Sequence, residues 1–149
     1  MKRSAYVGFI LIATFLLLTP ALAQQAKSKA EYDAYKAIYD EQDPQRKAQL
    51  AETFINDFGD SEFIPAAFQL MSNAYVSARN WRKVVETAER FNQTVPDANS
   101  AVKGFMYQRA MAAAEQGRDV AKVIQYGENV LQVDRNNLGA LLTLSTVIT

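Results

Sequence analysis

The stretch that decides the fold occurs twice in this chain, first as FQLMSNAYVSARNWRKVVETAERFNQTVP (residues 68–96) and then as YQRAMAAAEQGRDVAKVIQYGENVLQVDR (residues 107–135). The two copies align without a gap at a spacing of 39 residues, which places Lys83-Val84-Val85 over Lys122-Val123-Ile124. A repeat of this length is typical of a helical array, in which each unit buries its apolar face against the next one. Such arrays usually present a binding surface, so the repeat favours an interaction protein over an enzyme.

Apolar residues recur at helical spacing from residue 29 onward, and no strand-like alternation interrupts them. The expected helices are separated by residues that commonly cap or break helices. We expect a first helix over residues 29–41 and further helices that begin at Asp43-Pro44, at Ser61, at Asn80, at Ser100, after a turn at Gly117 and Asp119, and near Leu138, with Gly59 capping the second and Pro96 ending the fourth. Seven helices joined by short turns indicate one all-α domain.

The first 23 residues have the layout of a secretory signal peptide. Lys2 and Arg3 give a basic start, residues 5–19 form an apolar run, and a small-residue cleavage signal ends at Ala23. As a helix this run would be about 22 Å long, shorter than the roughly 30 Å hydrocarbon core of a bilayer. We therefore expect cleavage after Ala23, a periplasmic or secreted protein, and disorder over residues 24–28. The alternative is an uncleaved anchor that holds the chain at the periplasmic face of the inner membrane.

The composition excludes several classes of function. The chain contains no cysteine and no histidine, so it cannot form a disulfide, a thiol nucleophile, a Ser-His-Asp triad or an imidazole metal site. Without Lys2 and Arg3, the basic residues are two fewer than the 16 acidic ones, whereas nucleic-acid binding requires a basic surface. We expect no enzyme activity, no cofactor, no metal and no nucleic-acid partner.

Residues 65–97 carry the order of side-chain sizes that is found in tetratricopeptide repeats. Large apolar, small and aromatic residues follow that order at Phe68, Met71, Ser72, Tyr75, Val84, Ala88, Phe91 and Pro96. This unit therefore resembles a tetratricopeptide repeat, and the junction before it, residues 54–68, is similar to junctions in bacterial envelope members of the family. The next unit departs from the pattern at Met111, Ala114 and Arg135, and the first unit is recognisable mainly in its second helix.

The resemblance implies an all-α fold in which antiparallel helix pairs stack into a right-handed superhelix. It implies units at residues 29–61, 62–98 and 99–136, followed by a half unit at residues 137–149. Small residues at the helix crossings would allow close approach, and large ones would fill the grooves beside them. The first helix of each pair would line a concave face. Trp81, at the start of a second helix, would pack between neighbouring units and bind no ligand.

The half unit is strongly apolar. Leu141, Leu144 and Ile148 fall on family positions of a fourth repeat, and no charged residue follows Arg135. We expect these three side chains to form an exposed end face. A solenoid normally ends in a polar cap, and this sequence shows none. Either the sequence is a truncated piece of a longer protein, which we favour, or another chain covers this face. Self-association through the half unit is a further expectation.

Ligands of the family lie in the concave groove. Carried over to this sequence, the contact positions include Gln69, Asn73, Val76, Ser77, Phe105, Gln108 and Ala112. Asn73 matches one position of the clamp that some cytosolic members use for C-terminal carboxylates, but the basic residues that complete the clamp are absent. Gln69, Asn73 and Gln108 could hydrogen-bond to an extended peptide backbone, or they could be ordinary solvated polar residues.

Two functions follow from these observations. The first is an exported scaffold that binds a protein or an extended peptide segment through its concave face and helps to assemble or organise an envelope complex. The second is an accessory repeat module truncated from a longer periplasmic enzyme or transport-system protein. A membrane is an expected partner only if the signal segment is retained as an anchor.

Overall fold

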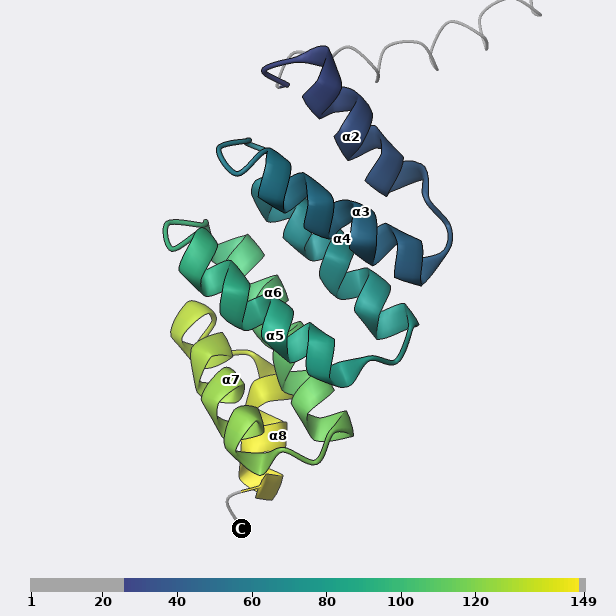
Figure 1. The fold of residues 1–149 in the computed structure, drawn as a ribbon. Coiled ribbons are helices and arrows are strands. Elements are labelled where there is room, and N and C mark those ends of the chain that lie inside the picture. The colour runs from purple at the N-terminus through teal and green to yellow at the C-terminus, as the bar shows by residue number, and fades with distance from the viewer. Residues whose placement is uncertain (1–25, 148–149) are drawn as a thin grey trace, which may run out of the picture.

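The computed structural model describes residues 26–147, and this part of the chain consists of seven helices without a strand. The helices are α2 (Lys29–Asp40), α3 (Pro44–Asp57), α4 (Ile64–Ser77), α5 (Trp81–Thr94), α6 (Ser100–Gln116), α7 (Val120–Val133) and α8 (Leu138–Val147). Consecutive helices pack against one another and form a row that runs from α2 to α8 (Figure 1). The expected all-α class is confirmed.

The starts of three helices follow from local capping. The side chain of Asp43 accepts a hydrogen bond from the backbone N–H three residues later, at 2.8 Å, and Pro44 occupies the first turn of α3. Asn80 and Asp119 cap α5 and α7 in the same way. Each cap satisfies a donor that the helix cannot satisfy internally, and its loss costs roughly 1 kcal/mol. These three starts lie where the sequence predicts them.

The expected start of α4 at Ser61 is wrong by three residues. The Ser61 hydroxyl accepts a hydrogen bond from the backbone N–H of Phe63 at 3.0 Å, and this bond holds a turn ahead of the helix. The helix then begins at Ile64 with Pro65 in its first turn, where the missing N–H of proline has no helical partner to lose.

Two expected caps are also displaced. Asn99 caps α6 by accepting from the backbone N–H of Val102 at 3.0 Å, so Ser100 is the first helical residue and not the cap. Asparagine and serine are nearly equal as caps, and the sequence offers them side by side. α3 ends in a cap at Phe58, and Gly59 does not adopt the left-handed conformation that a glycine cap uses.

The two copies of the repeat share the same turn between their helices. Arg79 and Arg118, which are aligned, both have a left-handed backbone, with φ angles of 53° and 57°. The next residue in each copy, Asn80 or Asp119, donates its backbone N–H to a carbonyl in the last turn of the preceding helix at 2.9 Å. The same residue then caps the next helix. The repeat in the sequence is therefore also a repeat in the backbone.

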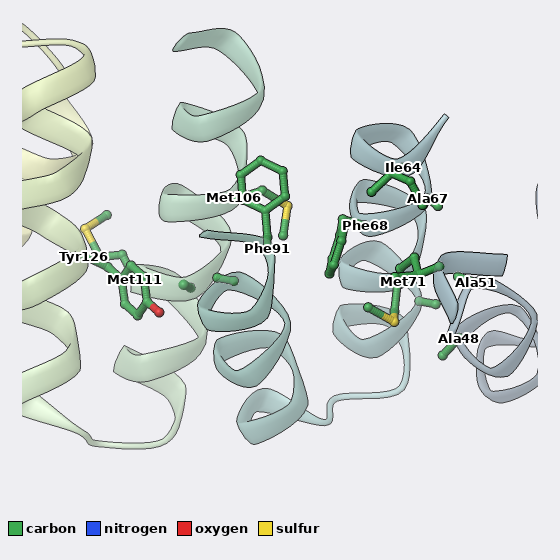
Figure 2. Packing of buried hydrophobic residues seen from close by; sticks show 14 of the residues in the cluster. Ala48, Ala51, Ile64, Ala67, Phe68, Met71, Phe91, Met106, Met111 and Tyr126 are labelled. Carbon is green, nitrogen blue, oxygen red and sulfur yellow. The ribbon is translucent and has the colours of Figure 1, made fainter. Parts of the chain in front are cut away.

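A buried core runs through the row of helices (Figure 2). Six of the residues that carry the family resemblance are almost fully buried: Phe68, Met71, Ser72, Val84, Ala88 and Phe91. Tyr75 is half-buried, and Pro96 is exposed beyond the end of α5. The rings of Phe68 and Phe91 pack edge to face with centroids 5.6 Å apart. Burial of each large side chain contributes roughly 1.5–3 kcal/mol, so this contact holds α4 against α5.

The apolar side chains of α7 do not all face the core. Val120, the first residue of the helix, is exposed, whereas Tyr126 is fully buried. The ring of Tyr126 packs against Tyr107 with centroids 6.2 Å apart. The Tyr126 hydroxyl has no hydrogen-bond partner within the described residues.

The expected exposure of Leu144 is also wrong. Its side chain packs on Gly127 of α7, where a methyl group added to the glycine would lie 2.8 Å from Leu144 Cδ2. The absence of a side chain at Gly127 lets α8 approach α7 closely enough to bury Leu144. Leu141 stays 43% exposed, and Ile148 lies outside the described residues.

The beginning of the described chain contacts the turn between α3 and α4. Lys27 Nζ pairs with the carboxylate of Asp60 at 2.7 Å, and Ser28 caps α2. Residues 26–28 of the segment expected to be disordered therefore make defined contacts with the fold. The signal peptide predicted over residues 1–23 lies outside the described residues.

Candidate protein-interaction surface

The residues that the resemblance implicates in ligand contact lie on α4 and α6, which are neighbours in the row. None of the seven is buried: Gln69, Asn73, Val76 and Phe105 are half-buried, and Ser77, Gln108 and Ala112 are exposed. All seven therefore keep surface that a partner could contact. We call this set the α4–α6 surface.

The buried face of α4 explains why part of this set faces outward. α4 packs against α3 and α5 and buries a stripe that consists of Ala67, Phe68, Met71, Ser72 and Ala74. Since a helix has 3.6 residues per turn, Gln69, Asn73 and Val76 fall on the other side. The same packing that builds the core thus leaves two amides and one apolar side chain on the remaining face.

The amide groups of the α4–α6 surface are unused. The side chains of Gln69, Asn73 and Gln108 form no hydrogen bond with any other residue in the range 26–147. Each amide has an oxygen that can accept a hydrogen bond from a backbone N–H and a nitrogen that can donate one to a backbone carbonyl. This arrangement fits recognition of an extended segment through its main chain.

A cationic side chain that the sequence analysis did not single out lies within this surface. The guanidinium carbon of Arg109 stands 5.2 Å from the ring centroid of Phe105, one helical turn earlier. Stacking of this kind is worth about 0.5–1 kcal/mol at an exposed site. Arg109 pairs with no carboxylate in the described part of the chain, so its charge remains available. The four-residue spacing of an aromatic and an arginine on one helix is the sequence signal that reveals it.

A hollow of about 310 Å³ lies elsewhere, between α5 and the turn that joins α6 to α7. Its lining includes Trp81, Val85 and Glu89 of α5, with Ala114 and Lys122 on the other side. Trp81 is half-buried and lines this hollow together with residues of the next helix pair. The hollow has charges of both signs, and Lys122 pairs with Glu89 across it.

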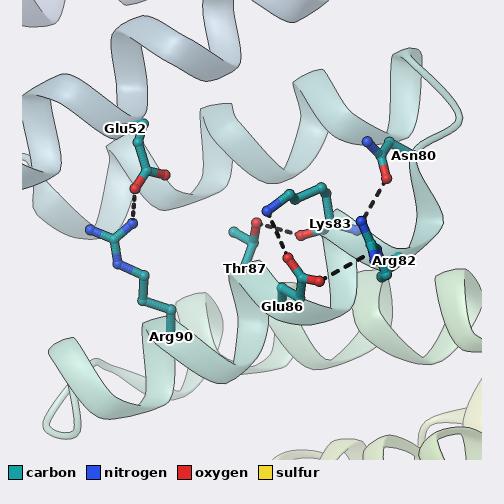
Figure 3. A network of polar contacts seen from close by, with 7 residues as sticks. All are labelled: Glu52, Asn80, Arg82, Lys83, Glu86, Thr87 and Arg90. Atoms are coloured by element: carbon teal, nitrogen blue, oxygen red, sulfur yellow. Dashed lines mark hydrogen bonds and ion pairs between the residues drawn. The ribbon is translucent and has the colours of Figure 1, made fainter.

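Charged side chains join α5 to α3 (Figure 3). Arg90 of α5 pairs with Glu52 of α3 and also donates to the side-chain oxygen of Asn56 at 2.8 Å. Within α5, Lys83 lies 2.8 Å from Glu86, and this hydrogen bond raises the pKa of the Lys83 ammonium. The basic residues near the start of α5 therefore have an acidic neighbour on the same helix.

Burial raises the pKa of the Tyr126 hydroxyl well above its usual value, and charge on Glu89 and on the ionisable hydroxyl of Tyr107 acts in the same direction. A tyrosine in this state keeps its proton at neutral pH. Tyr126 therefore packs in the core as a neutral side chain.

Neither a metal site nor a membrane-spanning helix is found among residues 26–147. Groups of three or more acidic side chains that could hold a metal ion do not occur there. No helix in this range is both long and apolar enough to cross a membrane.

Comparison of the chain with models of protein families, with curated protein sequences and with solved structures found no match. The candidate surface therefore depends on the geometry described above and on the resemblance of the repeat.

Proposed function

We propose that this protein is an exported scaffold of the tetratricopeptide type, which binds a protein or an extended peptide segment and helps to organise an envelope complex. Binding would occur on the α4–α6 surface. The observation that carries the proposal is that Gln69, Asn73 and Gln108 keep unused amide groups on two neighbouring helices. Buried or internally bonded amides could not recognise a partner without first losing those bonds.

Three features of the fold support the repeat interpretation. The two copies share a left-handed arginine in the same turn, at Arg79 and Arg118. Alternate helices contact each other, since α4 touches both α2 and α6. The second helix of each copy buries its fourth-from-last residue, which is Phe91 in α5 and the aligned Val130 in α7. A right-handed superhelix with a concave face lined by α4 and α6 is the arrangement that we propose for these pairs.

The proposed surface combines three kinds of contact. The amides would pair with the backbone of the bound segment, Val76 and Phe105 would contact its apolar side chains, and Arg109 would attract an acidic one. Because the three amides lie on two helices that contact each other, main-chain pairing along an extended segment would carry most of the recognition.

Site-specific photocrosslinking in the native host tests this proposal. A photoreactive phenylalanine analogue would replace Gln108 on α6 in one variant and Gln125 on α7 in the other, since both residues are exposed glutamines. We expect a discrete adduct from position 108 and none from position 125. A synthetic peptide of the crosslinked segment should then bind the wild-type chain and lose affinity when Gln69 and Asn73 are both replaced by Ala. Equal labelling from both positions would contradict the proposal.

Export has a separate test. The mass of the mature protein recovered from the periplasm or the medium should lack residues 1–23. A full-length protein in the membrane fraction would instead show that the segment is retained as an anchor.

A further inference from the structure

The hollow of about 310 Å³ beside Trp81, which we call the Trp81 hollow, has a counterpart one helix pair earlier. A space of about 240 Å³ lies between α3 and the turn that joins α4 to α5. Three of its lining residues hold the second, fifth and sixth places of α3, and the residues at the same places of α5 line the Trp81 hollow. Its other lining residues are Tyr75, Ala78 and Asn80, and the residues 39 positions after each of them also line the Trp81 hollow. The two spaces are therefore the same feature of the repeat.

The ring of Tyr75 divides this feature in the earlier copy. Tyr75 lines the space of about 240 Å³ and also a second space of about 120 Å³. The lining of the second space includes Glu52, which is the ninth residue of α3, and Lys83, which is the third residue of α5. The ring of Tyr75 therefore stands between the two spaces and separates them.

The later copy has no ring at this place, because Ala114 is aligned with Tyr75. Glu89 and Lys122 hold the ninth and third places of their own helices, and both line the Trp81 hollow together with Ala114. The ring of Tyr126 packs in the core against another tyrosine and leaves this hollow open. Without a ring on α6, the two spaces of the earlier copy are joined in one hollow.

The charged neighbours of the Tyr75 hydroxyl are kept in the later copy. Burial raises the pKa of the Tyr75 hydroxyl, charge on Glu52 raises it further, and the charge of Lys83 lowers it. This hydroxyl therefore lies near an acidic and a basic side chain. In the later copy the equivalent side chains, Glu89 and Lys122, form an ion pair at the hollow. A hydroxyl placed there could donate to the carboxylate or accept from the ammonium group.

The walls of the Trp81 hollow suit an aromatic ring. Ala113 and Ala114 are buried and form its floor, and the half-buried Trp81 and Val85 stand beside them. An indole packs well against a second ring, either offset and parallel or edge to face. A volume of about 310 Å³ is at the lower end of the range for ligand pockets, which is roughly 300–1,000 Å³, so the hollow has room for a small group.

We propose that the Trp81 hollow binds the side chain of a tyrosine that belongs to a partner protein. The ring would lie between Trp81 and Ala114, and its hydroxyl would reach the Glu89 carboxylate. The rim favours an attached side chain over a free phenol, because exposed residues of both charges, among them Arg82 and Asp119, surround the buried floor. A polar rim around an apolar centre is the arrangement of a protein interface. The hollow and the α4–α6 surface consist of different residues, so this inference does not rest on the proposed function.

A tyrosine flanked by glycines provides the probe. Acetyl-Gly-Tyr-Gly-amide would be titrated into the ¹⁵N-labelled full chain and followed by NMR. Trp81 is the single tryptophan of the chain, so its indole N–H gives one signal that reports on the hollow. We expect saturable shifts of this signal and of backbone amides in α5 and in the turn between α6 and α7. The same peptide with phenylalanine should bind about fivefold more weakly, because it lacks the hydroxyl.

Substitutions that fill the hollow should prevent binding. Ala114→Tyr supplies the ring that Tyr75 supplies in the earlier copy and should weaken the affinity at least about tenfold. Val85→Phe narrows the hollow from a half-buried wall, so it gives the same test if overpacking at Ala114 unfolds the chain. Ala101→Tyr makes the first change at an exposed alanine of α6 and should leave the affinity within about twofold. Circular dichroism would establish that each variant keeps its helical content.

Tyr75→Ala tests the comparison between the two copies in the opposite direction. This substitution removes the ring that separates the two earlier spaces. The tyrosine peptide should then gain a second site, seen as additional shifts in α3 and in the turn between α4 and α5.

Several results would overturn the proposal. They are the absence of a saturable shift with the tyrosine peptide, wild-type affinity in a folded Ala114→Tyr or Val85→Phe chain, and the absence of a second site in Tyr75→Ala. Shifts confined to the α4–α6 surface would also overturn it and would leave the proposed function intact. A saturable shift with p-cresol and none with the peptide would identify a free phenol as the occupant and would overturn the assignment to a partner's tyrosine.

Discussion

Residues 68–96 and 107–135 build the same backbone from different side chains. On the second helix, Thr87 and Phe91 of α5 are aligned with Tyr126 and Val130 of α7, and all four are buried. The large residue has thus moved by one helical turn. The repeat maintains a filled interior without keeping a large side chain at any one position, because packing depends on total volume and shape.

The first helices show the matching change. Met71 and Tyr75 of α4 are aligned with Ala110 and Ala114 of α6, so the later copy has less side-chain volume on this helix. Tyr126 adds volume on the facing helix and belongs to the same buried cluster as Ala110 and Ala114. The ring of Tyr126 thus lies in the part of the core where the facing helix carries alanines. The cost of this exchange is the Tyr126 hydroxyl, which is buried without a partner in the described residues.

Truncation of the large residue in the earlier copy should have the largest effect. Phe91→Ala removes a ring that packs on Phe68 and should lower the free energy of unfolding by about 3–5 kcal/mol in urea denaturation. The aligned Val130→Ala removes fewer buried atoms and should cost less. Equal losses at the two positions would contradict the view that the large residue has moved to Tyr126.

The next largest loss of stability is expected at Gly127, which is aligned with Ala88 of the earlier copy. Gly127→Ala forces the added methyl against Leu144 and should displace α8, at a cost of about 1–3 kcal/mol from overpacking. Hydrogen exchange should show faster exchange in α8 with little change in α4. In Gly104→Ala the new methyl would meet Val133 Cγ1 at 3.4 Å, so helix propensity should offset the strain and leave stability nearly unchanged. A Gly127→Ala chain with full protection of α8 would show that Leu144 can move aside.

Removal of the buried hydroxyl should have a smaller and opposite effect. Tyr126→Phe keeps the ring and should raise the free energy of unfolding by about 1 kcal/mol at pH 7, because it removes an unpaired polar group from the interior. The aligned Thr87 bonds its hydroxyl to the Lys83 carbonyl at 2.6 Å, so Thr87→Val should bring no comparable gain. A loss of stability in Tyr126→Phe would mean that a water molecule satisfies the hydroxyl.

Wild-type protein and Tyr126→Phe should also differ in how their stability changes in alkaline solution. An unfolded chain ionises Tyr126 near pH 10.0, whereas in the folded chain the raised pKa keeps the hydroxyl protonated. The folded state therefore loses stability as pH rises above 10, by up to about 1.4 kcal/mol per pH unit relative to Tyr126→Phe. Urea titrations between pH 9 and pH 11 would measure this difference. Parallel curves for the two proteins would contradict the burial of the hydroxyl.

The smallest effect concerns the aligned glutamates Glu89 and Glu128. Glu89→Gln breaks the pair with Lys122, whose side chain is about one-third exposed, and should cost only a few tenths of a kcal/mol. Glu128→Gln should cost nothing measurable in the isolated protein, since no cation of the described residues reaches it. The difference should vanish near 1 M salt because the pair at Glu89 is then screened. A salt-independent difference would indicate that Glu89 acts through packing.

Local signals in the sequence were sufficient for the helices and their order. The period of the apolar residues and the caps at Asp43, Asn80 and Asp119 are properties of a few neighbouring residues, so they can be read without a neighbouring helix. The predicted start at Ser61 is displaced because this serine holds a turn ahead of α4. The predicted cap at Ser100 is displaced because the adjacent asparagine caps α6 equally well. The residues of the α4–α6 surface could be placed on two helices from the repeat register, whereas the resemblance gave no reason to include Arg109.

Only the tertiary structure decided what lies between the helices. The burial of Tyr126 depends on the alanines of the facing helix, and the burial of Leu144 depends on the missing side chain of Gly127. The pairing of Glu52 with Arg90 joins residues 38 apart in the sequence. Side-chain volume and charge are matched across helices that meet only after folding, and the position of each helix fixes which residues meet. For that reason Glu89 pairs with a lysine of another helix, whereas the aligned Glu128 has no partner among residues 26–147.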